Sequence, residues 1–79
     1  MITIEEALAW IADLFEEPKE NIKAETLRQD IPTWDSLGIL TLMAKLDEDY
    51  DIILSEEELQ NLRTVDDILS VMRRNGKLK

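Results

Sequence analysis

Ser36 is the strongest candidate for a reactive side chain in this sequence. It lies between Asp35 and Leu37 in the run "DSLGIL", where a polar residue precedes a long apolar stretch. A serine hydroxyl can act as a nucleophile, but it is weak unless a neighbouring base activates it. The 79-residue chain has no histidine and no cysteine, and its two glycines are too few for a phosphate-cradling loop. The sequence therefore does not predict a self-sufficient enzyme. Ser36 either only caps a helix or also carries chemistry.

The acidic stretch "DEDYDIILSEEE" at residues 47–58 is a second candidate site, with seven acids and no base. Aligned with the twelve-residue calcium loop of an EF-hand, its oxygen-bearing side chains occupy positions 1, 3, 5, 9 and 12. These are Asp47, Asp49, Asp51, Ser55 and Glu58. Position 6 needs a glycine, whereas this chain has Ile52, which resists a positive φ. We predict no specific metal site here, and expect residues 52–54 to be an apolar segment tucked under the fold.

The first predicted element is a helix over residues 4–15, in which Thr3 and Glu6 have the spacing of a capping box. Its apolar stripe is Ile4, Leu8, Ile11 and Phe15, with Trp10 at the rim of the core and Pro18 ending the helix. Residues 16–35 then form a long connection, which is unusual in a small domain unless it is packed. Its apolar residues, Ile22, Leu27, Ile31 and Trp34, predict that it lies across the bundle, with a short helical turn near residues 25–30.

The second helix is predicted to begin at Asp35 or Ser36 and to end near Tyr50. At about 100° per residue, one arc forms the core face. It comprises Ile39, Leu42, Met43, Leu46 and Tyr50. A second arc holds Leu37, Leu40 and Ala44, flanked by Ser36, Asp47 and Glu48. Periodicity allows two interpretations of this second arc: the first helix or the long connection covers it, or it is a surface for a partner.

Two further helices complete the predicted fold. Ser55 and Glu58 begin a short third helix with Leu59 and Leu62 facing inward, and Thr64 caps a fourth with Asp67 three residues on. The apolar face of the fourth helix is Val65, Ile68, Leu69 and Met72, and Gly76 supplies a left-handed cap after it. Residues 1–79 are therefore predicted to form one all-α domain, a four-helix bundle with a long loop between its first two helices.

The charge balance bears on partners, because 18 acids against 9 bases give a net charge of −9. This argues against binding nucleic acid, which needs clustered lysines and arginines. It favours a monomer that meets partners with basic patches through electrostatic steering. The sequence has no apolar run long enough to span a membrane and no signal-peptide pattern, so we expect a cytoplasmic protein.

The run "DSL" at the start of an amphipathic helix, the later "LDEDYDI", an acidic short helix and "TVDDIL" together resemble the acyl carrier protein family. The resemblance covers nearly the whole chain, from "TIEEAL" to about Met72. It implies an acyl carrier protein that holds acyl or aminoacyl cargo as a thioester on 4′-phosphopantetheine and presents it to enzymes of fatty-acid, polyketide or related biosynthesis. It also implies that a phosphopantetheinyl transferase attaches this group to Ser36. The alternatives are a calcium-binding EF-hand-like module at residues 47–58 and an acidic protein-interaction domain.

The resemblance implies roles for the residues of this sequence that match functional positions of the acyl carrier protein family. Asp35 and Leu37 match the residues that flank the modified serine. The positions that match the partner-binding face of the family are Leu37, Leu40, Thr41, Ala44, Asp47 and Glu48. We expect an acyl chain to insert between the second and third helices, lined by Met43, Leu46, Leu59, Leu62 and Ile68.

The sequence also departs from the family pattern around Ser36. Gly38 and Thr41 stand where carriers of housekeeping fatty-acid synthesis usually have acids, and Ile53 stands where an acid is common. Pro32 and Trp34 replace the usual small residues before the motif. The resemblance therefore favours a specialised stand-alone carrier.

Overall fold

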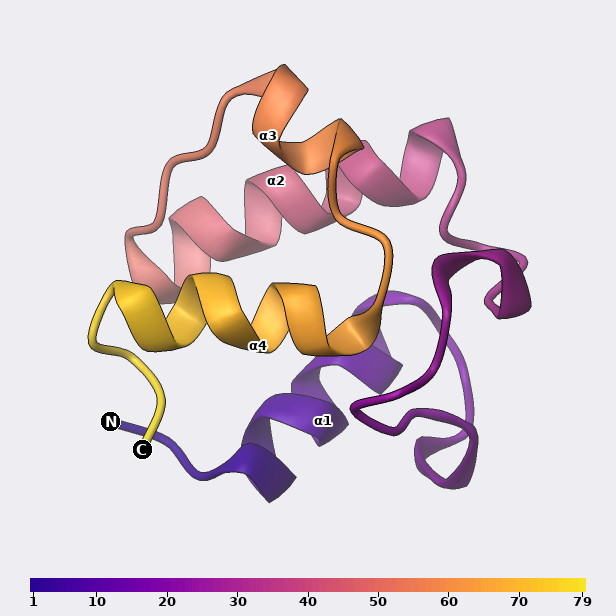
Figure 1. Ribbon diagram of the computed structural model, residues 1–79, viewed down its shortest axis with the longest axis horizontal. Coiled ribbons are helices and arrows are strands. Elements are labelled where there is room, and N and C mark those ends of the chain that lie inside the picture. The colour runs from indigo at the N-terminus through magenta and orange to yellow at the C-terminus, as the bar shows by residue number, and fades with distance from the viewer.

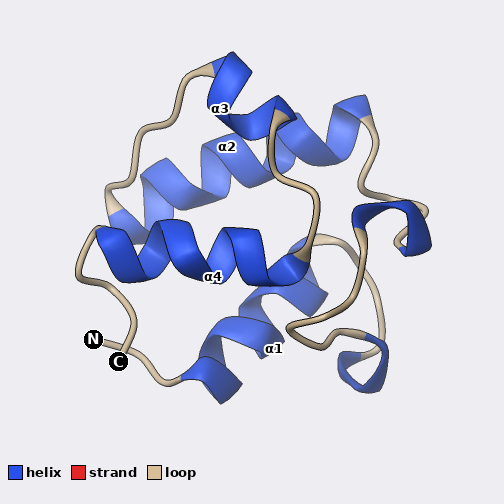
Figure 2. Cartoon of the chain, in the orientation of Figure 1, coloured by secondary structure: helices blue, strands red, loops and turns tan.

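The computed structural model describes residues 1–79 and contains four α-helices, α1 Ile4–Leu14, α2 Ser36–Tyr50, α3 Glu56–Gln60 and α4 Val65–Arg74. Two short 3₁₀ helices, Lys19–Asn21 and Arg28–Asp30, lie in the connection between α1 and α2. There are no strands (Figure 2), and an isolated bridge between Ile2 and Leu78 holds the two termini side by side (Figure 1). The predicted all-α bundle, with its long first connection and short third helix, is confirmed. No helix is long and apolar enough to cross a membrane.

The helix starts follow the capping side chains, as predicted. Thr3, Ser55 and Thr64 each accept a hydrogen bond from the backbone N–H three residues on, and each forms a complete capping box. The end of α4 is also as predicted, because Gly76 is left-handed with a φ of 71°. The N–H groups of Gly76 and Lys77 donate to the carbonyls of Arg73 and Met72, the two bonds of a Schellman motif.

The end of α1 differs from the prediction. The helix ends before Pro18, because Glu16 adopts a left-handed φ of 56° and the next N–H, of Glu17, donates to the carbonyl of Ala12 at 2.9 Å. This is again a Schellman motif, here without a glycine. The helix therefore ends at Leu14, in a left-handed turn at Glu16 that precedes the proline.

The capping box of α1 makes part of the stability pH-dependent. Hydrogen bonds from the backbone N–H and the hydroxyl of Thr3 hold the pKa of the Glu6 carboxyl below its ordinary value. A lowered folded pKa means that this stabilisation is complete above the unfolded pKa and is lost as pH falls through the folded pKa. Glutamine can fill the same place in a capping box without titrating. Any melting-temperature advantage of the wild type over Glu6→Gln at neutral pH should therefore shrink on acidification, and a constant difference would contradict this account.

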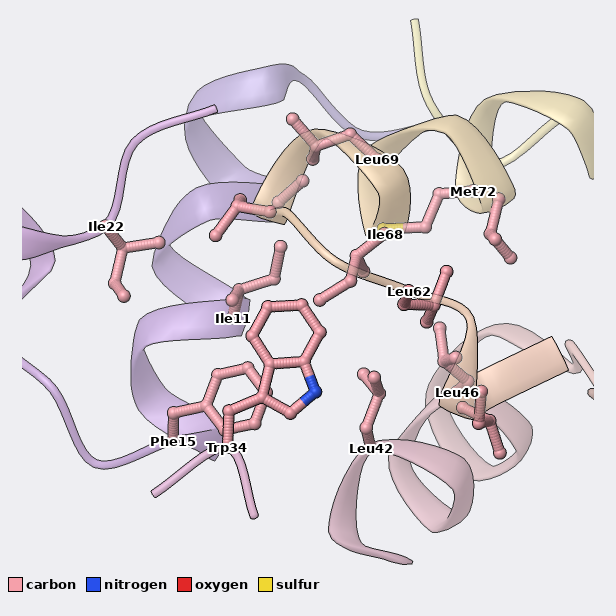
Figure 3. Packing of buried hydrophobic residues seen from close by; sticks show 14 of the residues in the cluster. Ile11, Phe15, Ile22, Trp34, Leu42, Leu46, Leu62, Ile68, Leu69 and Met72 are labelled. Atoms are coloured by element: carbon pink, nitrogen blue, oxygen red, sulfur yellow. The ribbon is translucent and has the colours of Figure 1, made fainter. Parts of the chain in front are cut away.

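The core is a single cluster of 19 buried side chains drawn from all four helices and from the long connection (Figure 3). The connection contributes Ile22, Ile31 and Trp34, as predicted, and the predicted inward face of α4 is fully buried. Three apolar residues are not where the sequence placed them. Ile4 is 42% exposed, Leu27 is 41% exposed and Ile53 is 81% exposed. The segment after α2 is therefore only partly tucked in, through Ile52 at 2% exposure.

The rim of the core joins α1 to the end of α2. The indole nitrogen of Trp10 donates a hydrogen bond to Asp49 Oδ2 at 2.7 Å, and the Trp10 ring meets the edge of Tyr50 with centroids 5.0 Å apart. Trp10 is half-buried, which confirms its predicted place at the rim. Met43 and Tyr50, predicted for the core face, are also half-buried beside the cluster.

Candidate functional site

Asp35, and not Ser36, caps the N-terminus of α2. The Asp35 backbone is extended, and its Oδ1 accepts a hydrogen bond from the Gly38 N–H at 3.0 Å. Ser36 is the first helical residue, its side chain is exposed, and its hydroxyl takes part in none of the side-chain hydrogen bonds of the protein. The interpretation of Ser36 as only a helix cap is therefore wrong, because its neighbour performs that role and leaves the hydroxyl free.

Gly38 sets the position of this helix start. A Cβ atom on Gly38 would lie 2.1 Å from the carbonyl oxygen of Thr33 and 3.3 Å from the Phe15 ring. The hydroxyl of Thr33 in turn donates to the carbonyl oxygen of Phe15 at 2.6 Å, at the end of α1. The backbone of α2, the preceding loop and the end of α1 thus meet at a point where only a hydrogen atom fits. This role of Gly38 was missed from the sequence, although an isolated glycine in a helical pattern can indicate such a contact.

The second arc of α2 is exposed to solvent. Leu37 is 72% exposed and Leu40 is 58% exposed, so neither α1 nor the long connection covers it. We call this surface the exposed strip. Its members are Leu37, Leu40, Thr41, Ala44, Asp47 and Glu48, all of them exposed. Large apolar side chains left open beside a free hydroxyl support the partner-surface interpretation over the covered one.

The acids of the exposed strip are free of ion pairs. The one ion pair in the protein joins Lys19 Nζ to Glu5 Oε2 at 3.9 Å, far along the chain from Asp47 and Glu48. These two carboxylates therefore remain available to the basic side chains of a partner. Exposed carboxylates of this kind raise association rates with positive surfaces more than they raise affinity.

The five residues predicted to line an acyl pocket lie in or beside the core. Leu46, Leu59, Leu62 and Ile68 are buried, and Met43 packs against them from the edge. Among them only Leu62 lines a surface hollow, which it shares with Leu54 and Val71 between α3 and α4. The structure thus places these side chains inward as predicted, but packed together. Their role in holding a cargo remains a prediction.

The acidic residues 47–58 do not form a calcium loop. Asp47 and Asp49 belong to α2, and residues 56–58 belong to α3, so the stretch is divided between two helices and the link between them. The left-handed residue is Asp51, with a φ of 55°, and Ile52 is buried after it. No three acidic side chains of this protein converge to hold a metal ion. The helical backbone at the first template positions removes the loop that an EF-hand needs.

No protein-family model matches the chain. The acyl carrier protein of Bdellovibrio bacteriovorus is 33% identical over 58 residues, which cover 73% of this chain and 74% of that relative. The chain belongs to the acyl carrier protein family. An acyl carrier protein homologue of Mycoplasmopsis pulmonis is 33% identical over 67 residues, with 85% of this chain and 90% of that protein covered.

A solved structure supports the same assignment for the fold. It belongs to a Mycobacterium tuberculosis protein assigned to the acyl carrier proteins, and it matches with a TM-score of 0.73 and 30% identity. The match covers 89% of this chain and 95% of that one. The names of these relatives describe carriers rather than catalysts.

Proposed function

We propose that this acyl carrier protein carries acyl or aminoacyl intermediates as thioesters on a 4′-phosphopantetheine group attached to Ser36. The observation that supports this most directly is that Asp35, and not Ser36, caps α2. The Ser36 hydroxyl is therefore exposed and makes no hydrogen bond. Ser36 needs an external catalyst, because no histidine is present to remove its proton. We assign that task to a phosphopantetheinyl transferase.

The residues around Ser36 fit a phosphate ester. Ser36 is the first residue of a 15-residue helix, so a phosphate on its oxygen would lie at the positive end of the helix dipole. The Asp35 carboxylate is directed to the Gly38 N–H, in the first turn of the same helix. The group would supply the terminal thiol on which a thioester forms, which a chain without cysteine cannot supply.

The test of this proposal is the intact mass of the protein. Incubation with coenzyme A, magnesium and a broad-specificity transferase should add the mass of one phosphopantetheine group per chain. Fragmentation should then place the added mass on the peptide that contains Ser36. Addition at Ser55 or Ser70, or no addition with several transferases, would overturn the proposal.

The exposed strip is the surface we propose for partner enzymes. Reversing the charge in Glu48→Lys should slow loading by the transferase, and more so at low salt than at high salt, because salt screens charges across an encounter surface. Glu25→Lys makes the same charge change on an exposed residue of the long connection and serves as the matched control. Equal slowing in both variants would attribute the effect to net charge, and an unchanged rate in Glu48→Lys would contradict the role of the strip.

The cargo site we propose lies between α2 and α3. Because the side chains there are packed together, a medium-length acyl chain should displace Leu59 and Leu62 from Leu46, and α3 is the element best suited to move. This helix is only five residues long and has a single buried residue, Leu59. The methyl resonances of these leucines should therefore shift on acylation, whereas shifts confined to the surroundings of Ser36 would indicate a cargo that stays in solvent.

We also propose that the partners belong to a dedicated pathway. The exposed Ile53, at 81% exposure, adds an apolar side chain near the end of α2, and Gly38 cannot be replaced by an acid without a collision with Thr33. An acid is thus excluded at position 38, and an exposed apolar side chain stands at position 53, where the family commonly has an acid. Slower loading by enzymes of housekeeping fatty-acid synthesis than by those of a dedicated pathway would support this view.

A further inference from the structure

The indole nitrogen of Trp34 is the one buried side-chain nitrogen or oxygen without a hydrogen-bond partner in this protein. Trp34 is 3% exposed and lies in a core that contains no buried polar or charged residue. Buried N–H groups in folded proteins are nearly always paired, and an unpaired one costs free energy. The protein itself therefore offers no acceptor to this donor.

The orientation of the Trp34 ring is fixed by its neighbours. The Phe15 ring stacks on it with centroids 5.1 Å apart and an angle of 24° between the planes. The guanidinium carbon of Arg28 lies 5.9 Å from the centre of the Trp34 ring, close enough for a cation–π contact. In Figure 3 the nitrogen points away from Phe15 and toward Leu42 of α2. The donor is thus held facing the interior.

A trapped water molecule is a poor partner for this donor. A stable buried water makes about three hydrogen bonds and needs polar atoms around it. The side chains on the inner side of Trp34, including Leu42, Leu46 and Leu62, are apolar members of the core cluster. An oxygen atom carried in on a ligand needs only the one donor. Such an oxygen therefore suits the site better than water does.

We infer that Trp34 is a specificity-determining residue that donates its indole N–H to an oxygen on the acyl chain of the cargo. This inference rests on the proposed function, because Trp34 lies two residues before Ser36 and faces the apolar interior in which we place the cargo. The ligand class is an oxygenated acyl chain, such as a β-keto chain, in preference to a saturated chain of equal length. A saturated chain leaves the N–H unpaired, and sites built around a buried polar group discriminate strongly against ligands that lack its partner.

The experiment compares two cargoes on the full-length carrier labelled with ¹⁵N. A broad-specificity transferase loads it from octanoyl or β-ketooctanoyl coenzyme A, and intact mass verifies each loading. The Trp34 indole cross-peak should move to higher proton frequency with the β-keto cargo and move less with octanoyl. Trp10 is the internal control, because its indole nitrogen already donates to Asp49 at 2.7 Å and should keep its position.

A substitution provides an independent measurement. Trp34→Phe keeps an aromatic ring beside Phe15 but removes the donor, so any gain in melting temperature from β-ketooctanoyl over octanoyl should be lost. Equal Trp34 shifts with both cargoes, no Trp34 shift, or a preference that persists in Trp34→Phe would each overturn the inference. A failure of the proposed function can be told apart from a failure of this inference, because without phosphopantetheine attachment the protein would gain no mass at the loading step. If Trp34→Phe does not fold, the indole shifts of the wild type decide alone.

Discussion

Ser36→Ala should abolish phosphopantetheine addition completely while leaving the helical content and the melting temperature nearly unchanged. Ser36 is exposed, and Asp35 provides the cap of α2, so the serine hydroxyl contributes no hydrogen bond to the fold. A surface substitution of this kind changes stability by at most about 0.5 kcal/mol. Intact mass after incubation with coenzyme A and a transferase measures the first effect, and circular dichroism during heating measures the second.

Ser70→Ala is the matched control for this prediction. Ser70 lies in α4, is half-buried and makes no side-chain hydrogen bond, so its removal should leave the mass gain intact. Asp35→Ala separates capping from modification. It should destabilise the protein by about 1 kcal/mol, as the loss of an N-cap does, without removing the proposed attachment site. Modification that persists in Ser36→Ala would refute the assignment of the attachment site.

Gly38→Ala should be the most damaging single-methyl substitution at the site. The new Cβ would lie 2.1 Å from the Thr33 carbonyl oxygen, which is a backbone atom and cannot rotate away. Forcing extra volume into a packed region typically costs about 1–3 kcal/mol, and a collision with backbone belongs at the upper end. For a domain of this size we therefore expect the melting temperature to fall by roughly 10–20 °C.

The other glycine of the chain gives a direct comparison. At Gly76 an added Cβ would meet no atom within 4 Å, but the residue has a φ of 71°. Gly76→Ala should therefore cost only the strain of a left-handed alanine, about 1 kcal/mol. Equal losses in the two variants would show that the α2 start adjusts to the methyl group, and would contradict the close contact. Gly38→Ala should also slow loading at Ser36, because relief of the collision must shift the first turn of α2.

The sequence alone determined where three of the four helices begin. Thr3, Ser55 and Thr64 predict the starts of their helices because a capping box lies within four consecutive residues, so its sequence signal is local. The long connection was also predictable in outline, since Ile22, Ile31 and Trp34 had to be buried somewhere in a domain this small. The family could be suggested from the order of these local signals, and the comparisons confirmed it.

Only the tertiary structure decided which surfaces are covered. Periodicity shows that Leu37 and Leu40 share a side of α2, but whether another segment lies over them depends on contacts between residues far apart in sequence. For the same reason Ile4 and Ile53 were placed inside and are exposed. The choice between Asp35 and Ser36 as the cap was open because aspartate and serine are both favoured N-cap residues. The structure gives this role to Asp35, whose Oδ1 accepts the Gly38 N–H, and leaves the Ser36 hydroxyl without a hydrogen bond.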